Sequence, residues 1–220
     1  MNTRLFCLLF AFCLNTSLYG QSSADETIED NFTVGEYLYQ EASYDIDPNT
    51  AYQHALSYLQ IAADYGKVEA QNYVGISYLN GIGYVQDTQK AIDWFKKAVE
   101  QDNADAMENL AVAYYRDGQP TAESMIWMKR AVEKGSTSAM NKLGLIYYLG
   151  NAVPVNQEEG LRWLTKAAEL GQENAMINLA GIYYRMGGDA NRAKSIEYFK
   201  LAAAKGNPMA INRLKELGVE

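Results

Sequence analysis

The sequence contains almost none of the side chains that build metal centres, disulfides or nucleophilic sites. Its 220 residues include two cysteines, Cys7 and Cys13, and one histidine, His54. Both cysteines lie in an apolar segment that we expect to be removed, so the mature chain has no thiol for a disulfide or a catalytic thiolate. His54 has no second histidine or cysteine with which to hold zinc, and we interpret it as a partly exposed helix residue. We therefore expect no catalytic residue, no metal site and no cofactor.

Long apolar runs are also scarce, and the one present stands at the start of the chain. Residues Leu5 to Leu14 are all apolar, Arg4 is the only charge among the first twenty residues, and a short polar stretch leads to Gly20. This pattern is typical of a signal peptide over residues 1–20, and it predicts a periplasmic or secreted protein. An uncleaved anchor is the alternative, but ten apolar residues fall short of the roughly twenty that a spanning helix needs. Lipid attachment is not expected, because phenylalanine rather than a small residue precedes each cysteine.

Basic residues are outnumbered, since 19 lysines and arginines face 27 acids and give a formal net charge of −8. Removal of Arg4 with the signal peptide subtracts one positive charge and leaves −9. Such a field repels nucleic acid and anionic lipid, and it suits a basic protein partner. Residues 21–31 are polar and carry four acids, so we expect a flexible acidic leader there.

A repeat with a period of 33 to 36 residues organises the rest of the chain. An alanine recurs at spacings of 36, 33, 36 and 35 residues; a small residue follows the first four alanines after five positions, and a tyrosine follows after eight. The alanines are Ala70, Ala106, Ala139, Ala175 and Ala210; the small residues are Gly75, Ala111, Gly144 and Ala180; the tyrosines are Tyr78, Tyr114, Tyr147 and Tyr183. Spacings of four and eight residues fall on one stripe of a helix, so this phrase predicts a helix, which we call helix A.

A second phrase runs in step with the first and predicts a second helix, helix B. Its aromatic position holds all three tryptophans of the chain, and the full set is Tyr58, Trp94, Trp127, Trp163 and Tyr198. We expect these aromatics to fill the space between helices. The phrase closes with Gly66, Asp102, Gly135, Gly171 and Gly206. A closing glycine adopts the left-handed conformation that ends a helix, and an aspartate adopts it at some cost.

The repeat resembles the Sel-one-like repeat (SLR) family, a relative of the tetratricopeptide repeats. The second repeat matches its small-residue, tyrosine, Gly-x-Gly-x-Val, aspartate and tryptophan positions at Gly75, Tyr78, Gly81 to Val85, Asp87 and Trp94. The resemblance implies an all-α, right-handed α/α solenoid over residues 32–217. We expect two-helix repeats at 32–66, 68–102, 104–135, 137–171 and 173–206, followed by a capping helix over 208–217. The third repeat is the shortest, because 13 residues separate its tyrosine from its tryptophan, against 16 in the second.

One position of helix A is our candidate for partner binding. In related solenoids helix A lines the concave side, and the position nine residues after the repeat alanine lies about 180° round the helix from that alanine. The candidates are the residues at this position, Leu79, Tyr115, Tyr148 and Tyr184, with Arg116, Asn141 and Arg185 beside them. Tyrosine offers a large contact area with a polar tip, which suits a protein-binding face. The alternative is that these tyrosines wedge between neighbouring repeats.

Two features that look catalytic have structural explanations. Gly81-Ile82-Gly83 lacks the third glycine of a dinucleotide site and the lysine of a P-loop, so it predicts a turn between helices. Glu158 and Glu159 stand at a helix start, where carboxylates favour the helix dipole. Some proteins with this repeat are described as β-lactamase-like, but those carry cysteine pairs in each repeat.

A surface built of repeats binds chains or domains better than it encloses a small substrate. We therefore interpret the chain as an exported protein-interaction module, a monomer with a protein partner. Three uses are open: an envelope scaffold, a secreted factor that binds a host protein, and an immunity protein against an exported toxin. The alternative functions are a β-lactamase-like or peptidoglycan-acting envelope enzyme, and a structural protein that self-associates through its open ends.

Overall fold

The computed structural model describes residues 24–45 and 47–219, and the expected signal peptide lies outside them. Eleven α-helices and one short 3-10 helix form from these residues, which contain no strand. The chain divides into two compact units between Ala113 and Tyr114. Unit 1 contains α2 (Ala24–Glu41), η1 (Ala42–Tyr44), α3 (Pro48–Asp64), α4 (Val68–Asn80), α5 (Thr88–Val99) and α6 (Ala104–Ala113). Unit 2 contains α7 (Ala122–Glu133), α8 (Thr137–Leu149), α9 (Gln157–Glu169), α10 (Glu173–Met186), α11 (Asp189–Ala204) and α12 (Pro208–Glu216).

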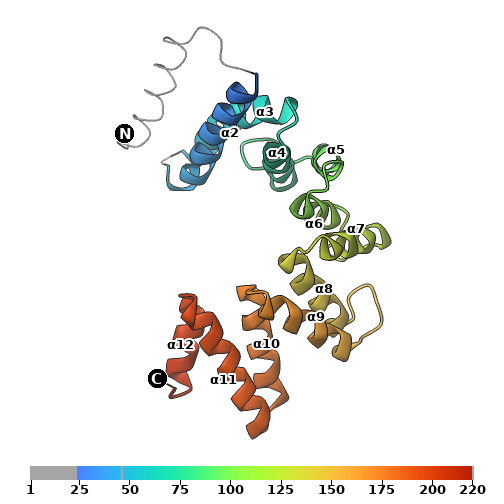
Figure 1. Ribbon diagram of the computed structural model, residues 1–220, viewed down its shortest axis with the longest axis vertical. Coiled ribbons are helices and arrows are strands. Elements are labelled where there is room, and N and C mark those ends of the chain that lie inside the picture. Colours follow the sequence, from blue (N-terminus) through green and yellow to red (C-terminus); the bar gives the residue numbers. More distant parts are fainter. Residues whose placement is uncertain (1–23, 46, 220) are drawn as a thin grey trace. The chain divides into compact units, whose positions relative to one another are not determined.

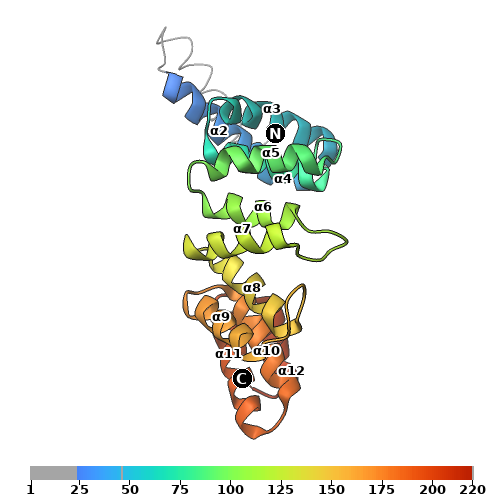
Figure 2. The ribbon, with the colours of Figure 1, turned by 90° about the vertical axis from the view of Figure 1, so that its right-hand side faces the viewer.

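Within each unit, helices pack mainly against their neighbours in the sequence. In unit 1, α2 packs on α3, α3 on α4, α4 on α5 and α5 on α6, and α4 also touches α6. The same succession runs from α7 to α12 in unit 2. Figures 1 and 2 show these stacked helix pairs inside each unit. Nearest-neighbour packing of helix pairs confirms the all-α solenoid that the repeat predicts.

Each helix B is followed by a residue in the left-handed region. The φ angles are 93° at Gly66, 60° at Asp102, 91° at Gly135, 88° at Gly171 and 87° at Gly206. Glycine reaches this region at little steric cost, and aspartate tolerates it better than most side chains. The predicted closing residues are therefore confirmed, including the one that is not glycine.

Polar side chains fix where the B helices begin. Asp47, Asp87, Thr121 and Asn156 each accept a hydrogen bond from the backbone N–H three residues ahead, at N to O distances of 3.0 to 3.4 Å. These bonds satisfy N–H groups that the first turn of a helix leaves free. Helix α11 departs from the pattern, because Gly188 precedes it and provides no side-chain cap.

Small residues in the middle of helix A allow helix B to approach closely. A Cβ atom at Gly75 would lie 2.5 Å from Cε1 of Phe95, and one at Gly144 would lie 2.8 Å from Cγ of Leu164. Phe95 and Leu164 are fully buried at these crossings. The small-residue side of helix A therefore faces the helix B of its own repeat, and a methyl group added at Gly75 or Gly144 would force those two helix pairs apart.

The tryptophans fill the space between helices only in part, which corrects the sequence interpretation. Trp94, Trp127 and Trp163 are only half-buried, whereas the next residues, Phe95, Met128 and Leu164, are fully buried. A cation lies over each indole: Lys97 Nζ at 3.7 Å, Arg130 Cζ at 4.7 Å and Arg162 Cζ at 4.8 Å from a ring centroid. Because neighbours on a helix point about 100° apart, the residue after the tryptophan faces helix A while the indole lies at the edge.

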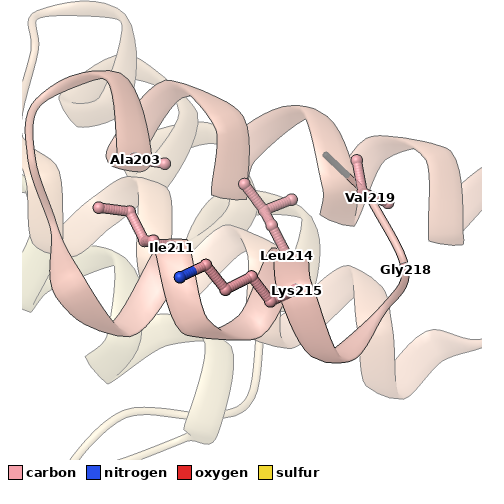
Figure 3. Close-up of a pocket in the computed structure, with 6 residues that line it drawn as sticks. All are labelled: Ala203, Ile211, Leu214, Lys215, Gly218 and Val219. Atoms are coloured by element: carbon pink, nitrogen blue, oxygen red, sulfur yellow. The ribbon is translucent and has the colours of Figure 1, made fainter.

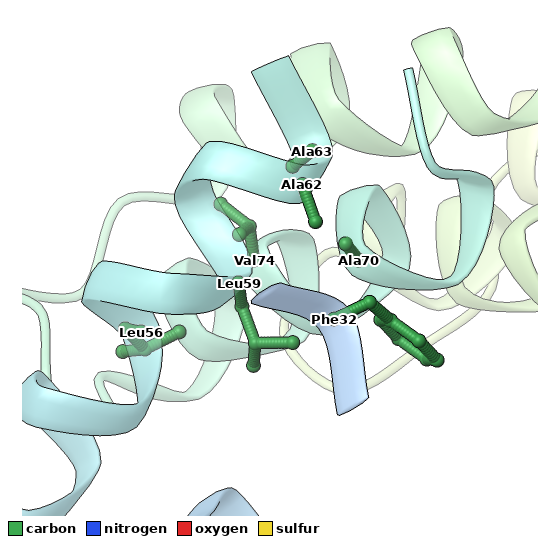
Figure 4. Close-up of a cluster of buried hydrophobic side chains, with 7 residues drawn as sticks. All are labelled: Phe32, Leu56, Leu59, Ala62, Ala63, Ala70 and Val74. Carbon is green, nitrogen blue, oxygen red and sulfur yellow. The ribbon is translucent and has the colours of Figure 1, made fainter. Parts of the chain in front are cut away.

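The expected flexible leader is helical from Ala24 onward, which corrects the sequence interpretation for residues 24–31. Ile28 packs against the core of unit 1, and the ammonium of Lys67 lies 2.8 Å from a carboxylate oxygen of Glu29. Two acids in the first turn of α2 also favour a helix start. Figure 4 shows the core that α2 joins, which consists of Phe32, Leu56, Leu59, Ala62, Ala63, Ala70 and Val74. Residues 21–23 lie outside the described part of the chain.

Candidate partner-binding surface

A groove of about 300 Å³ lies on the helix A side of unit 1. Helices α2 and α4 and the start of α6 provide its lining, which consists of Glu36, Glu69, Asn72, Tyr73, Ile76, Asn103 and Asp105. Three of these seven residues are carboxylates and none is basic, so we call this set the acidic groove.

Helical register places these side chains together. Glu69, Asn72, Tyr73 and Ile76 are three, one and three residues apart along α4, so they share one face of that helix. Gly75 points to another face, where α5 packs. Asp105 precedes the repeat alanine of α6 by one residue, as Glu69 does in α4, so successive repeats deliver an acid to the same place.

Hydrogen bonds fix the walls of the acidic groove. The Tyr73 hydroxyl donates to Oε1 of Glu36 at 3.1 Å, which joins α4 to α2. Nδ2 of Asn109 donates to Oδ1 of Asn72 at 2.9 Å and joins α6 to α4. Oδ1 of Asn103 accepts from the first turn of α6 at 2.7 Å. The groove is thus preorganised by side chains from three successive A helices.

An aromatic cluster supports the floor of the groove. The ring of Tyr73 lies 5.2 Å from that of Tyr39 and 6.4 Å from that of Phe32, centroid to centroid. Burial, and then the neighbouring Glu36, raise the pKa of the Tyr73 phenol. Burial also raises the pKa of Tyr39, whose hydroxyl accepts a hydrogen bond from Ser77 at 3.1 Å. Both phenols therefore stay neutral at physiological pH, and Tyr73 remains a hydrogen-bond donor to Glu36.

The acidic groove keeps most of its negative charge. Lys67 lies 3.6 Å from Glu69, but its ammonium is closer to Glu29, at 2.8 Å, and this hydrogen bond is the main cause of its raised pKa. A lysine or arginine from a partner could lay its apolar stem along Tyr73 and Ile76 and place its charge among the carboxylates. The described residues contain no group of three or more histidines, cysteines or acids that could hold a metal ion. None of their helices is long and apolar enough to cross a membrane.

Leu79 and Asn141, two of the seven predicted binding residues, have contrasting surroundings. Leu79 is half-buried near the end of α4, seven residues or about two turns beyond Asn72, and therefore on the stripe that lines the acidic groove. Asn141 is only 7% exposed, and its Oδ1 accepts a hydrogen bond from Nδ2 of Asn178 at 2.8 Å. That amide joins α10 to α8, as Asn72 and Asn109 join their helices in unit 1.

Tyr115 and Arg116 do not lie on helix A, because α6 ends at Ala113. Backbone hydrogen bonds of 2.9 and 2.8 Å link Arg116 and Gln119 in a tight turn. Asp117 and Gly118 between them have φ angles of 50° and 74°. The third repeat is short because its helix A ends early, with 10 residues in α6 against 13 in α4, so the helical position expected for Tyr115 does not apply. Its carbonyl accepts a 3.5 Å hydrogen bond from the guanidinium of Arg116.

The last three predicted residues belong to α8 and α10. Tyr148 is half-buried, and its Cβ lies 2.7 Å from where a Cβ of Gly160 would stand, so the base of this side chain lies against α9. Tyr184 is 44% exposed, and the guanidinium of Arg213 in α12 lies 4.9 Å from its ring centroid. Arg185 is exposed. Tyr184 and Arg185 are therefore accessible in unit 2.

Sequence reasoning missed the residues of the acidic groove itself. The signal was present as acids at equivalent positions, Glu69 and Asp105, directly before two successive repeat alanines. The contribution of Glu36 could not be read in the same way, because its repeat lacks both the alanine and the tyrosine of helix A.

Comparison with known proteins agrees with this architecture. The Sel1 repeat pattern matches residues 32–66, 68–103, 104–136, 137–172 and 174–207, which is most of the chain. The chain belongs to the Sel1 repeat family. Sel1 repeat proteins are protein-interaction modules, and their fold is typically not enzymatic.

Three solved structures show how widely this Sel1 architecture is used. A Sel1 repeat protein from Oxalobacter formigenes is 25% identical with a TM-score of 0.69, over 98% of this chain and 89% of that one. A protective antigen of uropathogenic Escherichia coli with an SLR fold is 26% identical with a TM-score of 0.63 over 87% of this chain, which spans 42% of the antigen's length. An immunity protein from Pseudomonas aeruginosa shares the fold at 24% identity and a TM-score of 0.54, over 80% of this chain and 67% of its own.

Proposed function

We propose that this chain is an exported protein-interaction module whose acidic groove binds a basic segment of a partner protein. The observation that carries the proposal is the groove itself, in which Glu36, Glu69 and Asp105 converge from three helices around an aromatic and aliphatic floor. Export rests on the pattern of the first twenty residues.

Charge complementarity supports the choice of a basic partner. The formal net charge of −8 attracts a cationic protein from a distance, and the groove then offers a fixed place for its side chains. Hydrogen bonds already hold the walls in place, so little conformational freedom is lost when the partner binds. A toxin with a basic surface is one such partner, and the likeness to an immunity protein makes this use worth testing beside scaffolding and host binding.

The test is a calorimetric titration of a capped peptide of alternating arginine and alanine into the chain, at low and at physiological salt. Replacing Glu36→Gln, Glu69→Gln and Asp105→Asn together removes three charges while keeping side-chain size. Three charge pairs of about 0.5 kcal/mol each add to about 1.5 kcal/mol, so we expect about tenfold weaker binding.

A matched control carries Glu100→Gln, Glu133→Gln and Glu197→Gln, which remove the same charge from exposed positions at the ends of α5 and α7 and in the middle of α11. We expect it to weaken binding little, and the difference to shrink as salt rises. Equal loss in both triple variants would mean that the overall charge, and not the groove, attracts the peptide.

A further inference from the structure

A second groove, of about 570 Å³, lies at the end of unit 2 between α11 and α12. Its lining is Ala203, Ile211, Leu214, Lys215, Gly218 and Val219. Figure 3 shows the aliphatic side chains of Ile211, Leu214 and Val219 together, with the ammonium of Lys215 beside them. Lys215 is the single charged residue in this lining.

Register shows which side of α12 this groove occupies. Ala210 is the repeat alanine of α12, so Lys215 takes the position that holds a small residue in each earlier helix A. That position faces the helix B of its own repeat in both units. The pairs are Gly35 with Leu59, Gly75 with Phe95, Gly144 with Leu164, and Ala180 with Ser195, whose hydroxyl donates to the Ala180 carbonyl at 2.8 Å.

The groove is therefore the surface of α12 on which a helix B would pack. Among the described residues after α12, Gly218 turns the backbone with a φ of 70°, and the N–H of Val219 donates back to the carbonyl of Leu214 at 3.0 Å. In α4, α8 and α10 this side is buried against the helix B of the same repeat, whereas in α12 it lines the groove.

We propose that this groove binds an amphipathic helix of a partner protein, which packs on α12 as a helix B packs on its helix A. The partner helix needs an apolar stripe for Ile211 and Leu214 and a carboxylate for Lys215. It also needs a small residue at the crossing, because the crossing position of α12 holds a side chain. One helix B of this chain already has a small residue at the crossing, since Gly160 of α9 lies where α9 crosses α8.

A peptide of residues 156–170, blocked at both ends, is a suitable probe. It combines Gly160 and three leucines with Glu158 and Glu159 in its first helical turn. Binding to the purified chain is followed by fluorescence anisotropy. A peptide of residues 87–100, which contains three lysines and three acids and aligns Phe95 with the crossing, is the control with no net charge and no glycine at the crossing.

We expect saturable binding of the first peptide and weaker binding of the second. Lys215→Gln should weaken the first interaction about two- to fivefold, as for a partly exposed ion pair. Lys129→Gln removes the same charge from an exposed position of α7 and should leave the affinity for the first peptide unchanged. Ile211→Glu should abolish binding, and thermal melting will show whether that variant remains folded.

Three results would overturn the proposal: no saturable binding of the 156–170 peptide, equal effects of Lys215→Gln and Lys129→Gln, or sedimentation showing a dimer that Ile211→Glu dissociates. The last result would assign the groove to a second copy of the chain. This test is independent of the acidic groove, because that groove belongs to unit 1 and the variants of Lys215, Ile211 and Lys129 belong to unit 2.

Discussion

Replacement of Phe95 by alanine should destabilise the chain more than the same replacement of its neighbour Trp94. Phe95 is fully buried, and its ring lies against Gly75 of α4. Removing the ring loses its transfer free energy and leaves a cavity, which together cost about 3–5 kcal/mol. Trp94 is half-buried, so its replacement loses part of a burial contribution and the contact with Lys97, about 2 kcal/mol in all.

The two variants are compared by urea unfolding followed by circular dichroism, with hydrogen exchange to show which helices open. Phe95→Leu provides a control for side-chain shape, and we expect it to cost about 1 kcal/mol because the leucine fills most of the site. A larger loss of stability for Trp94→Ala than for Phe95→Ala would refute the reasoning. It would mean that the indole, and not the residue after it, lies in the interface between helices A and B.

Four further outcomes are expected. Ala152→Gly should stabilise the chain by about 0.5–1 kcal/mol because Ala152 is exposed with a φ of 62°. The equivalent Gly83→Ala should destabilise it by about 2–4 kcal/mol, since the new Cβ would lie 2.7 Å from Cδ1 of Leu56; both are read as melting temperatures. Burial raises the pKa of Tyr84 from 10.0 to about 12, so its neutral phenol stabilises the fold fully below pH 10, and this contribution is lost as the pH rises towards 12. Tyr84→Phe should therefore make urea midpoints fall less steeply above pH 10, and an unchanged slope would contradict the assignment. With a chromogenic β-lactam we expect turnover no faster than buffer alone, and saturable hydrolysis would revive the enzyme alternative.

The repeat made the architecture predictable from the sequence. A helical pattern needs only the spacing of small and aromatic residues, and the closing positions could be assigned because glycine and aspartate tolerate a positive φ. The tryptophans were misplaced because a recurring large side chain suggests a core position, whereas each indole lies at the edge under a cation. The side chain that fills the crossing varies between Phe95, Met128 and Leu164, so it forms no motif in the sequence.

The binding surface was less predictable, for two physical reasons. The helical position of Tyr115 assumed that α6 continues, but the turn around Asp117 and Gly118 ends it first. The acidic groove depends on Glu36, whose helix in the first repeat lacks the usual markers. Proximity between Glu36, Glu69 and Asp105 arises from packing across three helices, which a single sequence does not reveal.

Site-specific photo-crosslinking in the native cell tests the central claim most directly. A benzophenone side chain replaces Ile76 on the floor of the acidic groove, or Glu133 on the exposed side of α7 as a control. We predict one protein adduct from position 76, none of the same species from position 133, and loss of the adduct when Glu36, Glu69 and Asp105 are neutralised. An adduct that forms equally from both positions, or that survives neutralisation, would contradict the account.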